Sequence, residues 1–462
     1  MMFERICSAV RKGPLEHSGK MTFSLLIFLI VLGMIPRIYG LYRMPGEFYH
    51  NDGEEYRDIS EQIFRGNGFS VSFYRWYEAV PAGGAKIHTD FSRPPMLPLL
   101  GAGLYFLPFD WTVSAKVMTL ILSGFCIFAV FLLGREVFSS NTVGLLGAFV
   151  YTFYPYSIYH SLCWSSGNLF LFLFCLGYMF LIRWFRTRAG WIAPALCGVF
   201  FAFASLTRPQ GAVFFLIFGV TGGILFLWRL PKSRRDAAGI FFRTAVFGFS
   251  GFLIFLPWMI RNYRACGIPA PVSFYGDYSF AQASSDVSYI TYRYVDTPEY
   301  KEQTDRVWEA YHGEKREQLK KAGVFSLPEA SPHWRRWAWE YIRENPKKMG
   351  FIVWNRILHC FRAAPNSAAV PPVVVHVLRI YFLLLLVLIA CGIWHSRKNG
   401  GAMLLLVPPA SALLLAIPFL MILRYRYPFF APFASILAAY GLFCLAEKLF
   451  LKKSPSREYA GC

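Results

Sequence analysis

Apolar runs of about twenty residues recur along nearly the whole chain and are separated by shorter polar stretches. A helix needs about 20 apolar residues to cross the roughly 30 Å of bilayer hydrocarbon. The runs lack the two-residue alternation of a membrane β-strand, and lipid leaves no backbone group unpaired, so we expect helices. The pattern predicts ten spans, near 21–39, 113–134, 141–161, 167–184, 190–206, 210–228, 242–260, 373–394, 401–422 and 428–446.

Composition agrees with this pattern. The chain is 55% hydrophobic and 18% aromatic, and only 16% of its residues are charged. These values are far from the average of soluble domains. We therefore predict an all-α, polytopic membrane protein.

The first apolar run has two possible meanings. It follows a basic leader, 1–20, and could be a signal peptide. A signal peptide has a shorter apolar core that ends in small residues, whereas this run has about 19 apolar residues and ends in IPRIYGLYRMPG. We favour an uncleaved first span with a cytoplasmic leader.

The short basic loops orient the bundle. With the N-terminus in the cytoplasm, every short basic cluster falls on the cytoplasmic side, as the positive-inside rule requires. The C-terminus is then cytoplasmic as well. Orientation explains much of the net charge of +20, so we do not infer nucleic-acid binding. The clusters are Arg183/Arg186/Arg188, Arg229/Lys232/Arg234/Arg235, Arg397/Lys398 and Lys448/Lys452/Lys453/Arg457.

The same orientation places two long polar segments, 41–110 and 261–372, on the outer side of an inner membrane. The stretch 92–109 is short, apolar and Pro-rich, which favours an interfacial helix. The second segment predicts a small helical outer domain whose amphipathic piece, 334–361, lies on the membrane surface. We divide the chain into a transmembrane module, 1–263, an outer subdomain, 264–372, and C-terminal helices with a tail, 373–462.

The ten cysteines are scattered, mostly within predicted spans, and have no metal-ligand spacing. Only Cys266 and Cys360 would face an oxidising compartment, and whether they form a bridge stays open.

An acidic stretch, HNDGEEYRDISEQIFRGNGFS, follows the first span and spans residues 50–70. One interpretation is a capping box, with Asp52 at the N-cap and Glu55 three residues on, opening a helix that runs to Phe64 and stops at Gly66. The functional interpretation is a catalytic carboxylate held at a helix N-terminus beside the membrane. The two interpretations are compatible.

Several arginines lie near the outer ends of spans, where the orientation rule predicts few cations. Snorkelling explains one such residue, but several together favour a shared anionic ligand. The planar guanidinium suits phosphate, and its place near the bilayer suits a lipid phosphate. A carboxylate base beside a phosphate site predicts a transferase with a lipid-phosphate leaving group. These residues are Arg93, Arg208, Arg261, Arg264, Arg424 and Arg426.

The order of several short motifs resembles the GT-C membrane glycosyltransferases, in particular bacterial relatives of protein O-mannosyltransferases and of lipid A aminoarabinose transferases. The motifs are the acidic stretch, SRPPMLPLL, LTRPQG, LPWMIRNYRACGIPAPVS and RYRYPFFAPF. The resemblance covers most of the chain. It implies a GT-C fold of about ten spans with interfacial helices in the first outer loop.

The resemblance also implies an activity: transfer of a sugar from a polyprenyl-phosphate carrier to a lipid, glycan or protein at the outer face, with inversion. The family acid corresponds to Asp52 as general base, and Glu54 or Glu55 would replace it if the register differs. Tyr56 follows it in the motif. With Arg93, Arg208, Arg261, Arg424 and Arg426, Tyr56 completes the predicted substrate-binding set.

One departure affects the cofactor. Relatives often carry a second acid before the fourth span, and here that place is Gly167, in Ser166-Gly167-Asn168-Leu169-Phe170. Glycine has no side chain to bind a metal, so metal dependence stays unknown, with Asp90 or Asp277 as substitutes.

Two other functions remain. A lipid-linked glycan ligase or flippase would also need outer arginines but would depend less on one carboxylate. A secondary transporter should bury charges at mid-membrane and show a repeat between halves. The ionisable residues cluster at span ends and no inverted repeat is visible, which disfavours a transporter.

Overall fold

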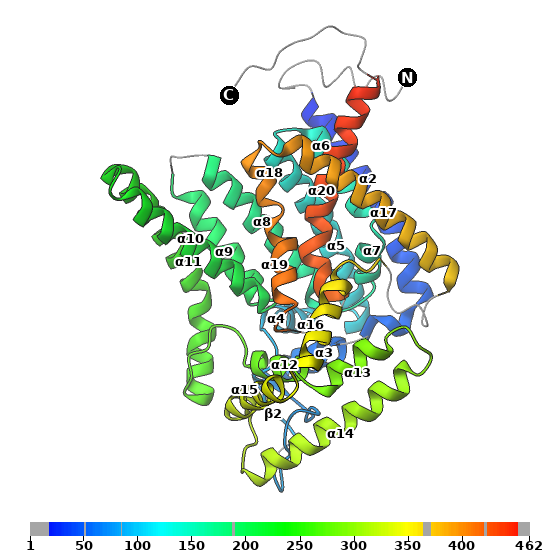
Figure 1. The fold of residues 1–462 in the computed structure, drawn as a ribbon, viewed down its shortest axis with the longest axis vertical. Coiled ribbons are helices and arrows are strands. Elements are labelled where there is room, and N and C mark those ends of the chain that lie inside the picture. Colours follow the sequence, from blue (N-terminus) through cyan, green and yellow to red (C-terminus); the bar gives the residue numbers. More distant parts are fainter. Residues whose placement is uncertain are drawn as a thin grey trace.

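The structure is a computed structural model that describes residues 18–49, 52–84, 86–186, 190–363, 371–419 and 423–450. These residues form helices and one short antiparallel pair, β1 (Ser70–Val71) with β2 (His88–Thr89). The helices make a long bundle with α6 and α18 at one end and α14 and α15 at the other (Figure 1). We call the end with α14 and α15 the polar end.

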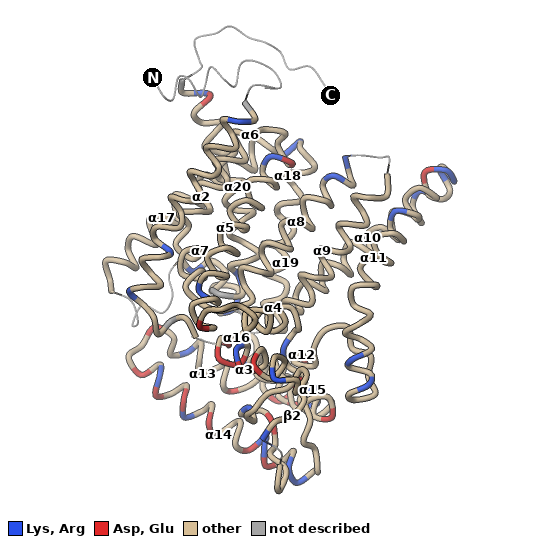
Figure 2. Tube along the Cα trace, turned by 180° about the vertical axis from the view of Figure 1, so that it is seen from behind, with Lys and Arg blue, Asp and Glu red and all other residues tan. Residues whose placement is uncertain are grey.

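Seven helices are long and apolar enough to cross a membrane. Charged residues gather at the two ends of the molecule, and the middle of the bundle is largely free of them (Figure 2). This distribution confirms a multi-pass, all-α membrane protein. The seven helices are α2 (Ser18–Arg43), α5 (Trp111–Phe138), α8 (Ser166–Arg186), α10 (Gln210–Arg229), α11 (Arg234–Cys266), α17 (Pro372–Ser396) and α20 (Leu423–Phe450).

The three other predicted spans are shorter or interrupted. The span at 190–206 is α9 (Ile192–Ser205). The span at 141–161 divides into α6 (Asn141–Thr152) and α7 (Pro155–His160), and the span at 401–422 into α18 (Gly400–Leu404) and α19 (Val407–Leu415). The helix α7 begins at Pro155, and Pro408 is the second residue of α19; proline has no N–H to continue a preceding helix.

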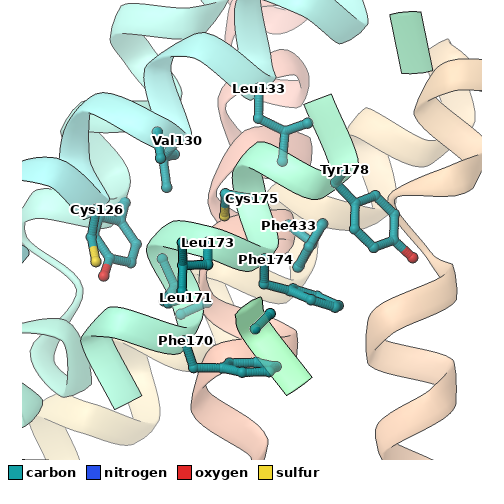
Figure 3. Packing of buried hydrophobic residues seen from close by; sticks show 14 of the residues in the cluster. Cys126, Val130, Leu133, Phe170, Leu171, Leu173, Phe174, Cys175, Tyr178 and Phe433 are labelled. Atoms are coloured by element: carbon teal, nitrogen blue, oxygen red, sulfur yellow. The ribbon is translucent and has the colours of Figure 1, made fainter. Parts of the chain in front are cut away.

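Aromatic side chains fill the centre of the bundle. Phe170, Phe174 and Tyr178 recur every four residues along one face of α8, so their rings stack above one another. Figure 3 shows Phe174 and Tyr178 beside Phe433 of α20, with ring centroids 5.8 and 5.0 Å from it. This contact fixes α8, which begins at the polar end, against α20.

Glycines let α17 and α20 approach closely. A Cβ built on Gly392 would lie 2.0 Å from the carbonyl oxygen of Leu437, and one on Gly441 would lie 2.1 Å from that of Leu388. Small residues at such crossings are how membrane helices gain packing energy where lipid supplies little hydrophobic driving force. The helix pair therefore depends on both glycines.

Arg37 of α2 is fully buried within the bundle. Its Nε donates to Ser123 Oγ at 2.6 Å and to Ser161 Oγ at 3.2 Å, and Nη2 donates to Ser157 Oγ at 3.0 Å. Its Nη1 donates to the carbonyl of Thr152 at 3.1 Å. One side chain thus joins α2 to α5, α6 and α7.

The first loop, residues 44–110, contains η1 (Pro45–Tyr49), α3 (Gly53–Phe64) and α4 (Met96–Leu104). As predicted, α3 ends at Phe64. Gly66 has a φ of +82°, and the N–H of Asn67 returns to the carbonyl of Gln62 at 2.9 Å. The predicted capping box does not form, because the Asp52 side chain makes no cap hydrogen bond.

Five helices, α12 (Tyr275–Ala283), α13 (Asp286–Tyr294), α14 (Tyr300–Lys321), α15 (Leu327–Glu344) and α16 (Pro346–Cys360), form the rest of the polar end. The amphipathic piece 334–361 is two helices, because Asn345 separates α15 from α16. Trp334, placed on the membrane surface by the sequence pattern, is instead fully buried 5.1 Å from the Tyr278 ring.

The same aromatic cluster also takes in Tyr77 of the first loop, whose ring lies 4.3 Å from Tyr278. The first loop and the helices α12, α14 and α15 therefore share a core. Cys266 and Cys360 are both free thiols, so the bridge that the sequence left open does not exist here.

Candidate functional site

A cavity of about 220 Å³ lies where the spans meet the first loop and α12. Figures 1 and 2 both place α3 and α12 at this junction, beneath the bundle. Charged and polar groups come from the first loop and from the starts of α8 and α10, while the side toward α19 and α20 is mainly apolar. The lining includes Asp52, Tyr56, Ser92, Arg93, Ser166, Arg208, Gln210, Tyr275, Ser279, Gln282, Leu415, Phe419, Tyr425 and Phe429.

Asp52 stands immediately before α3 and reaches the cavity. Its side chain is 27% exposed, and its Oδ1 accepts a hydrogen bond from Arg93 Nη2 at 3.0 Å. Because the carboxylate does not cap α3, it is oriented by the arginine instead. Asp52 is the one carboxylate among the described lining residues.

Glu54 and Glu55 point in different directions, since neighbours on a helix are about 100° apart. Glu54 is exposed. Glu55 is buried, and its Oε2 accepts from Arg75 Nε at 2.7 Å and from Arg93 Nε at 2.8 Å. Burial raises the pKa of Glu55, but the guanidinium groups of Arg93 and Arg75 outweigh it, so the pKa is lowered. Glu55 is a fixed counter-charge behind the cavity.

Arg75 forms ion pairs with Glu55 and with two other carboxylates, and the sequence analysis did not single it out. It is 2% exposed and forms ion pairs with Glu55, with Asp90 at 2.8 Å and with Glu78 at 3.5 Å. Burial alone would raise the pKa of Asp90, but Arg75 and hydrogen bonds from Arg93 and Ser92 lower it. Nothing in the stretch SVSFYRWYEA distinguishes Arg75 from a loop arginine.

Arg93 is held by carboxylates and by two aromatic rings. Its backbone N–H donates to Asp90 Oδ2 at 2.9 Å, and its guanidinium carbon lies 5.6 and 5.4 Å from the ring centroids of Tyr56 and Tyr275. Burial lowers the pKa of Arg93, but Asp52 and Glu55 outweigh it and raise the pKa. The result is a rigid cation that fixes Asp52 at the cavity wall.

The start of α8 forms the second polar wall. Ser166 Oγ accepts hydrogen bonds from Arg208 Nε at 2.9 Å and from the Tyr56 hydroxyl at 3.4 Å. Burial raises the pKa of Tyr56, so this hydroxyl stays protonated as a donor. A helix N-terminus with an adjacent guanidinium is a favourable environment for an anion.

Gly167, at the place of the second family acid, lies beside Arg208. A Cβ built on it would lie 3.6 Å from Arg208 Nη2. Neither suggested substitute lines the cavity, because Asp90 pairs with Arg75 and Asp277 accepts two hydrogen bonds from Arg335. Within the described ranges, no group of three or more His, Cys, Asp or Glu side chains is placed to hold a metal ion.

The other predicted arginines have different surroundings. Arg261 Nη2 donates to the carbonyls of Phe69 and Asp90 at 2.9 and 2.8 Å. Arg426 Nη1 donates to the carbonyls of Cys360 and Arg362 at 2.6 and 2.9 Å. Neither is among the described lining residues, and each donates hydrogen bonds to backbone carbonyls instead.

The Arg424 side chain falls outside the residues that the structure describes, and Arg264 is exposed. Of the six arginines considered from the sequence, Arg93 and Arg208 line the cavity. A ligand-binding role for Arg261, Arg424 and Arg426 stays a prediction.

Several neutral polar lining residues were also missed, among them Gln210, Tyr275, Ser279 and Gln282. Gln210 belongs to the LTRPQG motif, which drew attention to Arg208 alone. The α12 residues lie in a polar segment whose path toward the cavity no sequence pattern revealed.

The described part of the chain thus brings one carboxylate and two arginines together in a cavity where the spans meet the polar end. No protein-family model matches the chain, and no curated protein matches it significantly. Among solved structures, an oligosaccharyltransferase from Archaeoglobus fulgidus, described as a complex with Zn and sulfate, matches with a TM-score of 0.51 and 15% identity over 93% of this chain. This chain covers 50% of that protein, about half its length.

ArnT from Cupriavidus metallidurans, described as bound to undecaprenyl phosphate, matches with a TM-score of 0.39 and 11% identity, over 95% of this chain and 81% of that one. The fold assignment rests on the oligosaccharyltransferase. The protein has the GT-C glycosyltransferase fold, as the sequence motifs predicted.

Proposed function

We propose that the protein is a membrane glycosyltransferase that moves a sugar from a polyprenyl-phosphate carrier to an acceptor hydroxyl. The observation that carries this proposal is the cavity itself, in which Arg93 Nη2 orients Asp52 Oδ1 at 3.0 Å and Arg208 also lines the wall. The fold supports the same class of reaction.

In the proposed reaction, Asp52 takes the proton of the acceptor hydroxyl as its oxygen attacks the anomeric carbon. The bond from that carbon to the phosphate oxygen breaks, and the phosphate leaves with the bonding electrons. A single displacement of this kind inverts the anomeric carbon. In this proposal Glu54 and Glu55 do not serve as the base. Glu54 does not line the cavity, and Glu55 already accepts hydrogen bonds from Arg75 and Arg93.

Arg208, Ser166 and the N-terminus of α8 would stabilise the leaving phosphate. The charge that develops on its oxygen is met by a guanidinium and by backbone N–H groups already in position. Tyr56 holds Ser166 in place rather than contacting the reacting atoms. The apolar side, with Leu415, Phe419 and Phe429, suits the first isoprene units of the carrier.

The proposal includes an orientation. The polar end faces the outer side of the inner membrane, with both termini in the cytoplasm, because that arrangement keeps the short basic loops inside. The acceptor is a lipid, a glycan or a protein. The division into 1–263, 264–372 and 373–462 stays a prediction, although the shared aromatic core ties the second part to the first loop.

The second candidate is a lipid-linked glycan ligase or flippase. The arrangement of Asp52 favours the transferase, because a flippase has no use for a carboxylate oriented beside a phosphate site.

The test is Asp52→Asn in purified protein reconstituted in lipid vesicles with polyprenyl-phosphate sugars and a cell-envelope acceptor extract. We expect transfer to fall at least about 100-fold, the usual contribution of a general base, while donor binding persists. Asp58→Asn is the matched control. Asp58 lies on the same helix but binds Ser72, outside the cavity lining, and its variant should retain transfer. Normal turnover by Asp52→Asn would refute the mechanism.

A further inference from the structure

The helix α16 lies behind the cavity and contributes no described residue to its lining. It lies between α12 and the ends of α19 and α20 (Figure 1). Its buried residues, which include Arg356 and Cys360, recur every four positions and so form one face. Cys360 packs against Ala416, and Leu415 and Tyr425, which line the cavity, pack against the same pair. This face of α16 therefore supports the apolar wall of the cavity from outside.

Arg356 connects α16 to two walls of the cavity. It is fully buried. Its Nη2 donates to the carbonyl of Ala283, the last residue of α12, and its Nη1 donates to the carbonyl of Ile417, just beyond α19, at 2.9 Å. Carbonyls at helix C-termini lack partners within their helix and carry partial negative charge, which a guanidinium complements. Arg356 thus joins α12, which lines the cavity through Gln282, to α19, which lines it through Leu415.

The choice of arginine at this position calls for an explanation. No carboxylate of the described chain pairs with Arg356. Burying a cation without an anionic partner is costly, and an apolar side chain of similar volume would fill the space without that cost. Packing alone therefore does not account for Arg356. The two carbonyls do, because the planar guanidinium reaches two acceptors at once in a fixed geometry.

We infer that Arg356 is a positioning residue for the lipid-linked donor, and that it keeps α12 and the end of α19 at the separation that the donor occupies. This inference rests on the proposed function. Gln282 lies on the α12 side of the cavity, and Leu415 and Phe419 lie on the α19 side, so a ligand between them contacts both. Walls that are fixed in advance lower the ordering cost of binding. Asp52 belongs to the first loop, so its proton transfer does not depend on Arg356.

Two variants test this role. Arg356→Met keeps most of the side-chain volume but removes the donors, and Arg356→Lys keeps the charge on a single ammonium that lacks the fork. Dissociation constants are measured for a short-chain polyprenyl methyl phosphodiester with purified protein in lipid nanodiscs at pH 7. The KM for the donor and kcat come from the transfer assay. We expect Arg356→Met to raise Kd and KM about tenfold while kcat changes less than about threefold, and Arg356→Lys to lie between it and the wild type.

This division between KM and kcat separates positioning from stability. A variant that only folds less well has fewer binding sites and a lower apparent kcat, but its Kd and KM stay unchanged. Arg335→Met is the matched control. Arg335 of α15 also binds α12, through Asp277, but its side chain is 60% exposed and the link from Arg356 to α19 stays intact. The control should keep the Kd and KM of the wild type.

A measurement on the wild type does not depend on how the variants fold. Hydrogen exchange is followed with and without the methyl diester. Because α16 contributes no described lining residue, its protection by the ligand would come through the helices that it joins. We expect the diester to slow exchange in α12, in 413–419 and in α16 together, and to leave α14 unchanged.

Three results would overturn the inference: a Kd and KM of Arg356→Met equal to those of the wild type, an equal rise in Arg335→Met, or protection of α12 without protection of α16. In each case the wild type still binds the diester, so the proposed function survives. Failure of the wild type to bind the diester would overturn the proposed function and this inference with it.

Discussion

Replacing Arg75 by methionine tests whether the buried charges behind Asp52 act as one unit. The change removes the cation that pairs with Glu55, Glu78 and Asp90 but keeps most of its volume. Removing one partner of a buried ion pair leaves uncompensated charge and typically costs about 3–5 kcal/mol. We expect a loss of that size in the free energy of unfolding at pH 7, measured by chemical denaturation in detergent.

The same variant should weaken the pH dependence of stability. In the wild type the pKa values of Glu55 and Asp90 are lowered, so they stabilise the fold above their unfolded pKa values, and this contribution is lost as pH falls through the folded values. Without Arg75, Asp90 loses the largest of the interactions that lower its pKa, whereas Glu55 keeps Arg93. The variant should then lose less stability than the wild type as pH falls.

The matched control is Arg65→Met. Arg65 pairs with Glu61 on the same helix as Glu55, but its side chain is 63% exposed, and such surface pairs contribute below about 1 kcal/mol. The reasoning would be refuted if Arg75→Met and Arg65→Met cost the same, or if Arg75→Met lost as much stability as the wild type between neutral and acidic pH.

Two further changes test the leaving-group site and the helix packing. Arg208→Ala should weaken binding of any polyprenyl phosphodiester about 10- to 100-fold, the range expected for the loss of a charge-assisted hydrogen bond. Arg264 is exposed, so the control Arg264→Ala should bind as the wild type does. Equal dissociation constants for Arg208→Ala and the wild type would show that Arg208 does not bind the phosphate. Gly441→Ala should lower the free energy of unfolding by about 1–3 kcal/mol, measured by denaturation, because the added Cβ would collide with the Leu388 carbonyl. The control Gly248→Ala should not, because the space around Gly248 is open. Similar stabilities of the two variants would contradict the described contact between α17 and α20.

Much of the fold follows from hydropathy. The long spans and the bounds of α3 were predicted, because apolar length and a glycine stop are local properties of the chain. Interruptions such as the one before Pro155 were missed, because the sequence stays apolar across the break between the two helices. Trp334 was misplaced for a related reason: an amphipathic face shows that a helix has a buried side, not whether lipid or protein covers it.

The cavity gathers some of the residues that the sequence singled out. Asp52, Arg93 and Arg208 line one cavity, but Arg261 and Arg426 reach carbonyl oxygens instead. In sequence all of these arginines sit near span ends and look alike. What separates them is the direction of each side chain, which tertiary packing decides. Glu54 and Glu55 differ for the same reason.

Arg37 has a consequence for how the chain is made. Its hydroxyl partners Ser123 and Ser161 lie 86 and 124 positions later, so α2 leaves the ribosome long before they exist. Until then the guanidinium must extend to the lipid headgroups, as a cation on a lone helix does. Only when α5 and α7 insert can it turn inward, so the first helix reaches its final setting late in biogenesis.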